Sequence, residues 1–568
     1  MITLLTLISC VLVASSQVIH LKPGKVQGFE HITKNGDVAE VFLNIPYASP
    51  PVGELRFEKP TPPVPWNDIR DGTKFGASCH PIVPEAVFPP EQPSEDCLTL
   101  NIIRPKKEAP PSGFPILFWV HGGGYEIGSA LFYGYKGFAD IYIPSDIIVV
   151  TIQYRLGVYG FFSTGDSRIP GNLGLFDMAE ALKFIHANAE NIGGDRSRIT
   201  VWGHSAGSAA VGQLILSPVT RDYVARSIEM SGSPWASWAI GAKVANNSLE
   251  LAEALGCQSN IKECMKQKTT EEIYEGIENV VSIFVVSRHG IDIIKWGAVI
   301  DGEFIQHPDQ MTTTAPPKAS LVGVANKESS LFSIMGAAPF FQRLTVDPTD
   351  YRNWNRERLV SELKNLVEEI YIGDHLEELF NEIVSYYVDR DEEQQSEFYI
   401  DRYTEFLSDL MFVVPSVDSI LARRAAGWNM YAYVLDHYNE AIWDNQMFKK
   451  VPKRLRGAPH GCEFQYTKDM NLLNKFEFNE EEQVVADVFR QSLIEFVKTG
   501  APSNKHETWL DVGTGEDLRY LRVTPKPMMR LGFYSEPTSF WHNTLKHGFN
   551  MMQLLPTEKS GKKEKQEL

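Results

Sequence analysis

The sequence predicts an α/β fold in which helices cover both faces of a doubly wound, mostly parallel β-sheet that also carries helical insertions. Apolar runs at 115–120 and 146–154, the second rich in β-branched residues, predict central strands buried on both faces. Apolar residues at helical spacing between 175 and 185 predict a helix after these strands. A short apolar run at 199–202, followed by a helix-forming stretch at 206–216, continues the alternation.

Later segments extend this pattern. Residues 430–435 predict another strand, and residues 481–498 predict a helix that stops before Gly500 and Pro502. The segment 351–418 differs because it is helical in pattern and densely charged. We expect it to form a helical wall beside the functional site rather than to extend the sheet.

One large domain is expected over residues 17–550, because no Gly/Ser-rich or Pro-rich linker and no internal repeat interrupts the 568-residue chain. A hydrophobic content of 43% and a charged content of 22% are typical of an ordinary globular protein. The formal net charge of -18 argues against a nucleic-acid partner, which would require a basic surface.

Residues 203–207 (GHSAG) lie between the predicted strand and helix and match the pattern G-x-S-x-G. A serine on such a sharp strand-to-helix turn is held in a strained backbone conformation with its hydroxyl exposed. Gly203 and Gly207 would leave room for the neighbouring backbone. The pattern is short enough to arise by chance, so the interpretation of Ser205 depends on other segments.

Three such segments accompany Ser205. The sequence HGGG at 121–124 follows the first predicted strand, where backbone without side chains can direct N–H groups at a developing oxyanion. Glu328 follows an apolar stretch, and His460 lies in a Gly/Pro-rich loop. The chain order serine, acid, histidine is the order of an α/β-hydrolase fold.

Longer motifs then identify a family. Residues 95–105 (EDCLTLNIIRP) resemble, at every position, the cysteine signature of the type-B carboxylesterases, a family that includes the cholinesterases. Residues 193–207 also resemble the family's serine signature. The one departure is Ile192, which stands where the family usually has Phe. Supporting matches are 45–48 (IPYA), 50–57 (PPVGELRF), 154–157 (YRLG), 171–177 (GNLGLFD) and 301–302 (DG). The resemblance runs from about residue 26 to 541, and within the family it is strongest to nematode gut esterases.

The resemblance implies a carboxylic-ester hydrolase of broad specificity that acts through an acyl-enzyme intermediate. Ser205 would be the nucleophile, His460 the general base, and Glu328 the group that orients the imidazole. The backbone N–H groups expected to hold the oxyanion are those of Gly123, Gly124 and Ala206. An isolated His or Glu is more often structural, but three matches in the family's order favour these roles.

The resemblance also implies two disulfide bonds in an oxidising compartment, Cys79–Cys97 and Cys257–Cys264. Cys462 is left over, and we interpret it as a small buried hydrophobe rather than as a reactive thiol.

Two departures from the cholinesterases narrow the expected substrate. Those enzymes carry a Trp between the first two disulfide cysteines, which holds a quaternary ammonium, and an acidic residue just before the nucleophile. Here no Trp lies between Cys79 and Cys97, and His204 precedes Ser205. We therefore expect a small, uncharged ester as substrate. No metal-ligand or cofactor motif occurs, so neither a metal ion nor a cofactor is expected.

Two other functions remain open. Some relatives keep this fold with an inactive site and use their surface for adhesion or binding, but such relatives usually lack part of the Ser-Glu-His set that this chain keeps. A true lipase would need an interfacial lid, which the sequence does not reveal.

The two ends of the chain predict its location. Residues 1–16 form an apolar run with Ala14 and Ser16 at signal-peptidase spacing, so we expect a cleaved signal peptide and no membrane anchor. Asn246 begins the N-x-S/T sequon and is a candidate for glycosylation. The tail 551–568 is polar and ends in KQEL, which resembles the KDEL retrieval signal. We expect retention in the endoplasmic reticulum lumen through a retrieval receptor, with secretion as the alternative.

Overall fold

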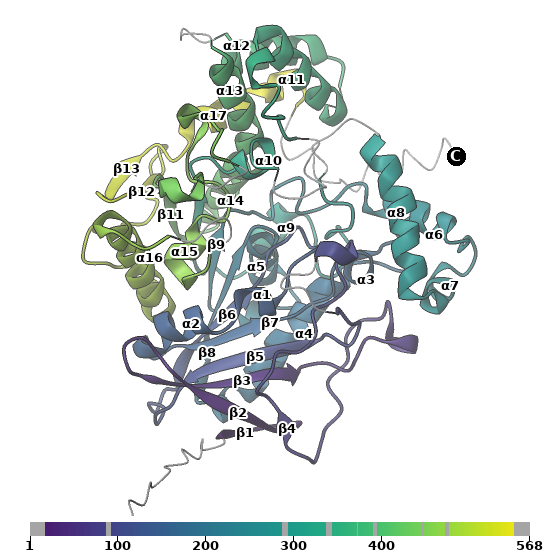
Figure 1. Cartoon of the computed structure of the whole chain (residues 1–568), viewed down its shortest axis with the longest axis vertical. Coiled ribbons are helices and arrows are strands. Elements are labelled where there is room, and N and C mark those ends of the chain that lie inside the picture. Colours follow the sequence, from purple (N-terminus) through teal and green to yellow (C-terminus); the bar gives the residue numbers. More distant parts are fainter. Residues whose placement is uncertain are drawn as a thin grey trace, which may run out of the picture.

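A computed structural model describes residues 17–86, 92–286, 293–336, 344–371, 373–389, 395–444, 448–471 and 476–549. The proposed signal peptide at 1–16 and the tail at 551–568 lie outside these residues. Within them, the chain forms a 13-stranded sheet with the order β1-β2-β3-β5-β7-β6-β8-β9-β10-β11-β12-β13, and β4 pairs with β2 (Figure 1). The strands are β1 (Gln17–Leu21), β2 (Gly24–Ile32), β3 (Val38–Pro46), β4 (Arg70–Asp71), β5 (Thr99–Pro105), β6 (Phe114–Val120), β7 (Ile148–Ile152), β8 (Gly194–His204), β9 (Arg226–Met230), β10 (Ala319–Ala325), β11 (Asn429–Leu435), β12 (Arg519–Val523) and β13 (Met528–Leu531).

The sheet is parallel from β7 through β6, β8, β9, β10 and β11 to β12. Every residue of β6 and of β7 is buried, as the uninterrupted apolar runs predict for strands covered on both faces. The predicted doubly wound α/β fold is therefore confirmed. The strands β1, β2, β3 and β5 and the last strand, β13, instead pair antiparallel with their neighbours along this order, while the short β4 pairs parallel with β2.

Helices cover both faces of the sheet. On one face, α2 (Lys136–Tyr142), α15 (Glu463–Lys468) and α16 (Glu480–Thr499) pack together. On the other face lie α4 (Leu173–Asn188), α5 (Ala206–Leu216), α9 (Pro308–Thr314) and α14 (Val414–Ala425). The helices predicted at 206–216 and 481–498 are confirmed, and so is the helical pattern between 175 and 185.

The charged segment 351–418 is helical, as predicted, and its described residues contain no strand. It forms α11 (Arg356–Ile370), α12 (Leu376–Tyr387), α13 (Ser396–Ser408), a π-helix (Asp409–Val413) and the start of α14. Figure 1 shows α11, α12 and α13 at the end of the molecule opposite β1 and β2. Lys327 and Ser329, which follow β10, bond to Asp401 and Ser408 of α13, so this segment packs against the loop at the carboxyl end of β10.

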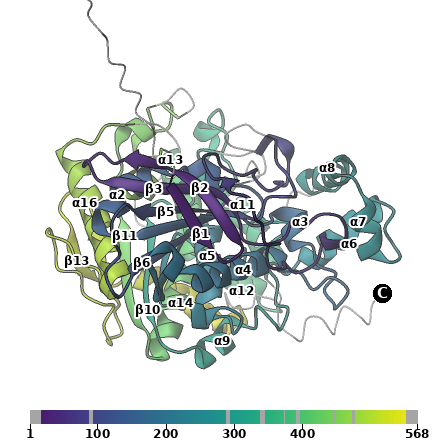
Figure 2. The ribbon, with the colours of Figure 1, turned by 90° about the horizontal axis from the view of Figure 1, so that it is seen from below.

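A second group of helices lies to one side of the sheet, namely α6 (Val244–Ala254), α7 (Ile261–Gln267) and α8 (Thr270–Val286) (Figures 1 and 2). The disulfide Cys257–Cys264 joins the end of α6 to α7, and Cys79–Cys97 closes a loop before β5. These are the two disulfide bonds that the resemblance to the type-B carboxylesterases implies. Cys462 carries a free, buried thiol. Among the described helices, none is both long and apolar enough to cross a bilayer.

Candidate functional site

Ser205 lies at the sharp turn between β8 and α5. Its backbone has φ 59° and ψ -127°, a conformation that residues with a side chain rarely adopt. The Ser205 N–H donates a hydrogen bond to the carbonyl of Met230, at the end of the neighbouring strand β9 (2.9 Å). The turn is thus held in its strained form by the sheet itself.

The two glycines of the GHSAG motif permit this turn. A Cβ atom on Gly203 would lie 2.1 Å from the carbonyl oxygen of Gly207, and one on Gly207 would lie 2.3 Å from the carbonyl oxygen of Val120. Neither contact can be relieved by moving a flexible side chain, because both involve backbone. The spacing of the glycines is therefore a steric requirement of the turn.

The HGGG segment lies directly against Ser205. A Cβ atom on Gly122 would come within 3.0 Å of the Ser205 Cβ, so only glycine allows this approach. Gly123 and Gly124 have φ values of 109° and 64°, in the left-handed region that favours glycine. The glycines of the HGGG loop therefore pack directly beside Ser205.

His121 fixes the start of this loop. Its ring stacks on Tyr154 at 4.4 Å, and the Tyr154 hydroxyl donates to the His121 carbonyl (2.8 Å). Burial lowers the pKa of His121 to about 4, so the ring is neutral at physiological pH. Its Nδ1 lies 2.9 Å from the Gly122 carbonyl, which can only accept, so this nitrogen carries the proton.

Glu328 and His460 form a buried acid–base pair. One carboxylate oxygen of Glu328 lies 2.6 Å from Nδ1 of His460, and the other accepts from the N–H of Ala325 at the end of β10 (2.7 Å). Glu328 is fully buried. Among the described residues, Nε2 of His460 has no hydrogen-bond partner although it is buried. The pair therefore leaves one imidazole nitrogen free to exchange a proton.

A small cavity of about 30 Å³ lies beside the predicted nucleophile and the HGGG loop. Its lining includes Ser205, Gly123 and Gly124. Two of its aromatic walls, Phe332 and Phe412, also contact the His460 ring, with centroids 5.6 and 4.8 Å away. Because β6, β8, β10 and β11 run parallel, their carboxyl ends meet at one edge of the sheet, where ligands commonly bind in such folds.

The apolar wall of this cavity depends on the π-helix. Phe412 lies in that helix and stacks on Phe332 at 5.7 Å. The indole N–H of Trp238, a third aromatic lining residue, donates to the carbonyl of Met411 in the same helix (2.7 Å). A π-helix is wider than an α-helix and is common at functional sites. Nothing in the sequence pattern of this segment predicts it.

Sequence reasoning also missed a second buried acid. Glu463 lies three residues after His460, is fully buried, and accepts from the hydroxyls of Ser231 (3.0 Å) and Tyr433 (3.2 Å). Burial, followed by the nearby charge of Glu328, raises the pKa of Glu463 to about 7. A single Glu at the start of a short helix carries no pattern that could have revealed this position.

Two further nitrogen-bearing side chains, those of His204 and Lys468, lie on the side of His460 that faces β8 and α15. The His204 ring lies 4.4 Å from the His460 ring, and the Lys468 ammonium lies 3.9 Å from the ring centroid of Trp202. Burial, followed by His460 and Lys468, holds the pKa of His204 well below its usual range. His204 is therefore neutral at physiological pH, unlike the acidic residue that cholinesterases have before the serine.

Among the described residues, no group of three or more His, Cys, Asp or Glu side chains is arranged to hold a metal ion.

Similarity to known proteins extends over nearly the whole chain. The model of the Carboxylesterase family matches residues 15–541. Gut esterase 1 of Caenorhabditis briggsae is 39% identical over 560 residues, which cover 97% of each chain. Gut esterase 1 of Caenorhabditis elegans is 39% identical over 540 residues, which cover 93% of each chain. Pyrethroid hydrolase Ces2a of Mus musculus is 31% identical over 551 residues, or 92% of this chain and 90% of the mouse protein.

Proposed function

The chain belongs to the carboxylesterase family and is a carboxylic-ester hydrolase, and from that premise we propose that it cleaves uncharged esters through a Ser-Glu-His triad and an acyl-enzyme intermediate. The observation that carries this proposal is the buried pair in which Glu328 binds Nδ1 of His460 and leaves Nε2 without a partner, while the His460 ring contacts Phe332 and Phe412 of the Ser205 cavity. This pair can activate a serine that would otherwise be a poor nucleophile.

In the proposed first step, Nε2 of His460 takes the Ser205 proton while the serine oxygen attacks the ester carbonyl. Glu328 holds the imidazole in the required tautomer and stabilises the imidazolium that forms. The new oxyanion accepts hydrogen bonds from the N–H groups of Gly123, Gly124 and Ala206. The imidazolium then gives its proton to the leaving alcohol, and the acyl group stays on Ser205.

In the second step, His460 deprotonates a water molecule that attacks the acyl-enzyme carbonyl. The carboxylic acid leaves, and Ser205 regains its proton from the imidazolium. No metal ion or cofactor takes part in this scheme.

The cavity supports an apolar acyl group of modest size. Trp238, Phe332 and Phe412 present aromatic surface beside Ser205, and such surface favours a hydrocarbon chain over a charged group. Two relatives from Mus musculus are named Pyrethroid hydrolase Ces2a and Acylcarnitine hydrolase, and both names describe hydrolytic activity. The geometry of Glu328 and His460 favours an active hydrolase over an inactive adhesion relative.

A panel of p-nitrophenyl esters of increasing acyl length tests this function. We expect turnover to be highest for short and medium chains, because the cavity is small and aromatic. An organophosphate should inactivate the enzyme, and peptide mapping should find the label on Ser205. No hydrolysis of any ester in the panel, or a label on another residue, would contradict the proposal. Activity that appears only above the solubility limit of long-chain esters would favour a true lipase.

We also propose that residues 17–550 form one domain that works in the secretory pathway. The buried hydrophobic cluster is continuous from Ile19 to Phe549, which supports a single domain. The two disulfide bonds suit an oxidising lumen. Asn246 is exposed on α6, so an N-glycan could be carried there. Residues 1–16 would direct entry, and the KQEL ending would be read by a retrieval receptor in the endoplasmic reticulum.

Deleting the last four residues is expected to move the esterase from the cell lysate into the medium, since retrieval would be lost. Turnover per molecule should not change, because the tail lies far along the chain from the site residues. Activity in lysate and medium, normalised to protein by immunoblot, measures both effects. Equal secretion with and without these residues would leave the enzyme assignment intact and remove the claim of retention.

A further inference from the structure

Asn326 lies two residues before Glu328. Its side chain links the loop that contains Glu328 to the loop that contains His460. We propose that Asn326 is a positioning residue for the hydrolytic reaction, because its side-chain amide sets the position of the Glu328 loop relative to the His460 loop. The inference rests on the proposed function of Glu328 and His460.

The Asn326 side chain is bound at both of its polar atoms. Its Oδ1 accepts a hydrogen bond from the N–H of Ala458, two residues before His460 (2.9 Å). Its Nδ2 donates to a carboxylate oxygen of Asp436, just after β11. The backbone N–H of Asn326 donates to the carbonyl of Leu435 at the end of β11 (3.0 Å). The residue thus joins three chain segments that are far apart in sequence.

Asp436 extends this connection to the next strand. Its other carboxylate oxygen accepts from Nε of Arg522 on β12 (2.6 Å), and its N–H donates to the carbonyl of Val523 (3.0 Å). The carboxyl ends of β10, β11 and β12 are therefore linked through one amide and one carboxylate. This linkage makes the position of Asn326 insensitive to movement of either loop alone.

The remaining links between the two loops cannot replace the amide. The N–H of Lys327 donates to the Ala458 carbonyl (3.1 Å), while the His460 N–H lies 3.4 Å from the Glu328 carbonyl, at the limit of a hydrogen bond. A Cβ atom on Gly457 would meet the Lys327 side chain at 2.2 Å, so the loops already touch. Apart from the Glu328–His460 pair itself, the side chain of Asn326 is the only one that, among the described residues, hydrogen-bonds between these two loops.

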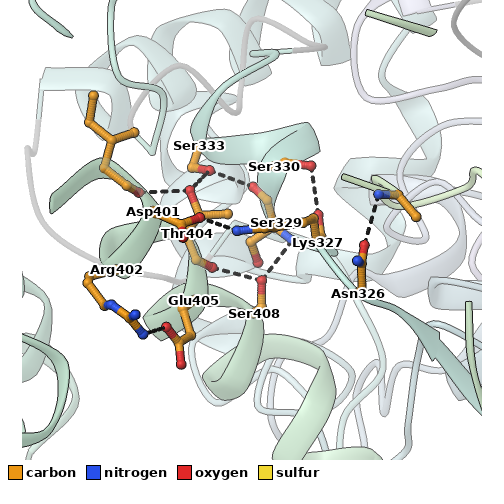
Figure 3. A network of polar contacts seen from close by, with 12 residues as sticks. Asn326, Lys327, Ser329, Ser330, Ser333, Asp401, Arg402, Thr404, Glu405 and Ser408 are labelled. Atoms are coloured by element: carbon orange, nitrogen blue, oxygen red, sulfur yellow. Dashed lines mark hydrogen bonds and ion pairs between the residues drawn. The ribbon is translucent and has the colours of Figure 1, made fainter. Parts of the chain in front are cut away.

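The Glu328 loop is also bound to α13, independently of the His460 loop. Figure 3 shows Lys327 paired with Asp401 of α13 and the N–H of Ser329 bound to the Ser408 hydroxyl (3.0 Å), while Asn326 points away from this group. Ser333 and Thr404 also share a hydrogen bond (2.8 Å). These bonds anchor the loop to α13, whereas the Asn326 side chain ties it to the His460 loop, in addition to the Glu328–His460 pair itself.

An amide at position 326 satisfies both of its neighbours, whereas a carboxylate cannot. The Ala458 N–H needs an acceptor, and the Asp436 carboxylate needs a donor. A carboxylate at position 326 would keep the acceptor for the Ala458 N–H, but it would also contact the Asp436 carboxylate. The repulsion between two negative charges costs more free energy in a partly buried site than in water. Misplacing a reacting group by about 1 Å can cost about 10²-fold in rate. We therefore expect an effect on kcat rather than on substrate binding.

The test compares Asn326→Asp with the exchanged pair Asn326→Asp plus Asp436→Asn. We expect the single variant to lose about 10²-fold in kcat with KM changed less than about threefold, because the substrate cavity is untouched. In the double variant, the amide introduced at position 436 would donate to the carboxylate introduced at position 326, and at least about a tenth of wild-type kcat should return. Steady-state kinetics, with active sites counted by organophosphate titration, provides these numbers.

Asn353→Asp is the matched control, because exposed Asn353 also donates to an aspartate, Asp350 (2.7 Å), and neither residue lines the Ser205 cavity. It should keep wild-type kcat. Asn326→Ala covers the case in which Asn326→Asp does not fold, since it removes both hydrogen bonds without adding charge. Its kcat should fall about tenfold or more while near-UV circular dichroism stays native.

A kcat within twofold of wild type in every folded variant at position 326 would overturn the proposal. So would a double variant that recovers nothing, because the loss would then arise from something other than the donor–acceptor match. These outcomes differ from failure of the proposed function, in which the wild-type protein itself would hydrolyse no ester or Ser205→Ala would remain active.

Discussion

Ser205→Ala is expected to lower kcat for p-nitrophenyl ester hydrolysis by at least about 10⁴-fold, because the acyl-enzyme cannot form without the serine oxygen. The free energy of unfolding should change by less than about 1 kcal/mol, since the change removes one hydroxyl and leaves the sheet and both glycines of the turn in place. Initial rates with purified protein and a thermal unfolding curve measure the two effects.

Ser197→Ala is the appropriate control, because Ser197 lies on the same strand β8 but is exposed at its other end. It should keep full turnover. If Ser205→Ala kept more than a few per cent of wild-type activity, the assignment of the nucleophile would be wrong, whatever the stability of the variant.

Glu328→Gln should have the second largest effect, a loss of about 10⁴-fold in kcat. Both carboxylate oxygens are used as acceptors, one from His460 Nδ1 and one from the Ala325 N–H. A Gln amide has only one oxygen, so its NH₂ group must face either the imidazole or the Ala325 N–H. Either arrangement disfavours the tautomer with a free Nε2 or leaves a buried donor unsatisfied.

The same ester assay measures this loss, and exposed Glu303→Gln serves as the control for the loss of a carboxylate. Organophosphate labelling of Glu328→Gln should be slowed in parallel with turnover, because both reactions need an activated serine. A variant with undiminished kcat would show that Glu328 is structural and that another group orients His460.

Local sequence was enough to predict the central strands and the turn. The runs that form β6 and β7 are apolar except for Thr151, because parallel strands are covered on both faces, and the pattern is therefore plain. The glycines at 203 and 207 are required by backbone contacts of 2.1 and 2.3 Å, and steric requirements of this kind leave a motif that can be recognised.

Other parts of the site leave no local pattern. Glu463 and Asn326 act through partners such as Ser231 and Ala458, which only the folded chain brings near. The antiparallel direction of β2, β3 and β5 depends on pairing between strands, which hydrophobic periodicity does not encode. Glu328 itself was predicted through resemblance to a family, because nothing near it in sequence distinguishes it from other glutamates.

The order of the strands has a consequence for synthesis of the protein. Ser205 follows β8, whereas His460 comes after β11, and β11 is flanked in the sheet by β10 and by β12 (Arg519–Val523). A ribosome adds about 5–20 residues per second, so the serine leaves the exit tunnel tens of seconds before the histidine that would activate it. β11 also lacks one neighbour until β12 has emerged. The nascent polypeptide is therefore expected to stay inert toward esters until β12 can pair with β11.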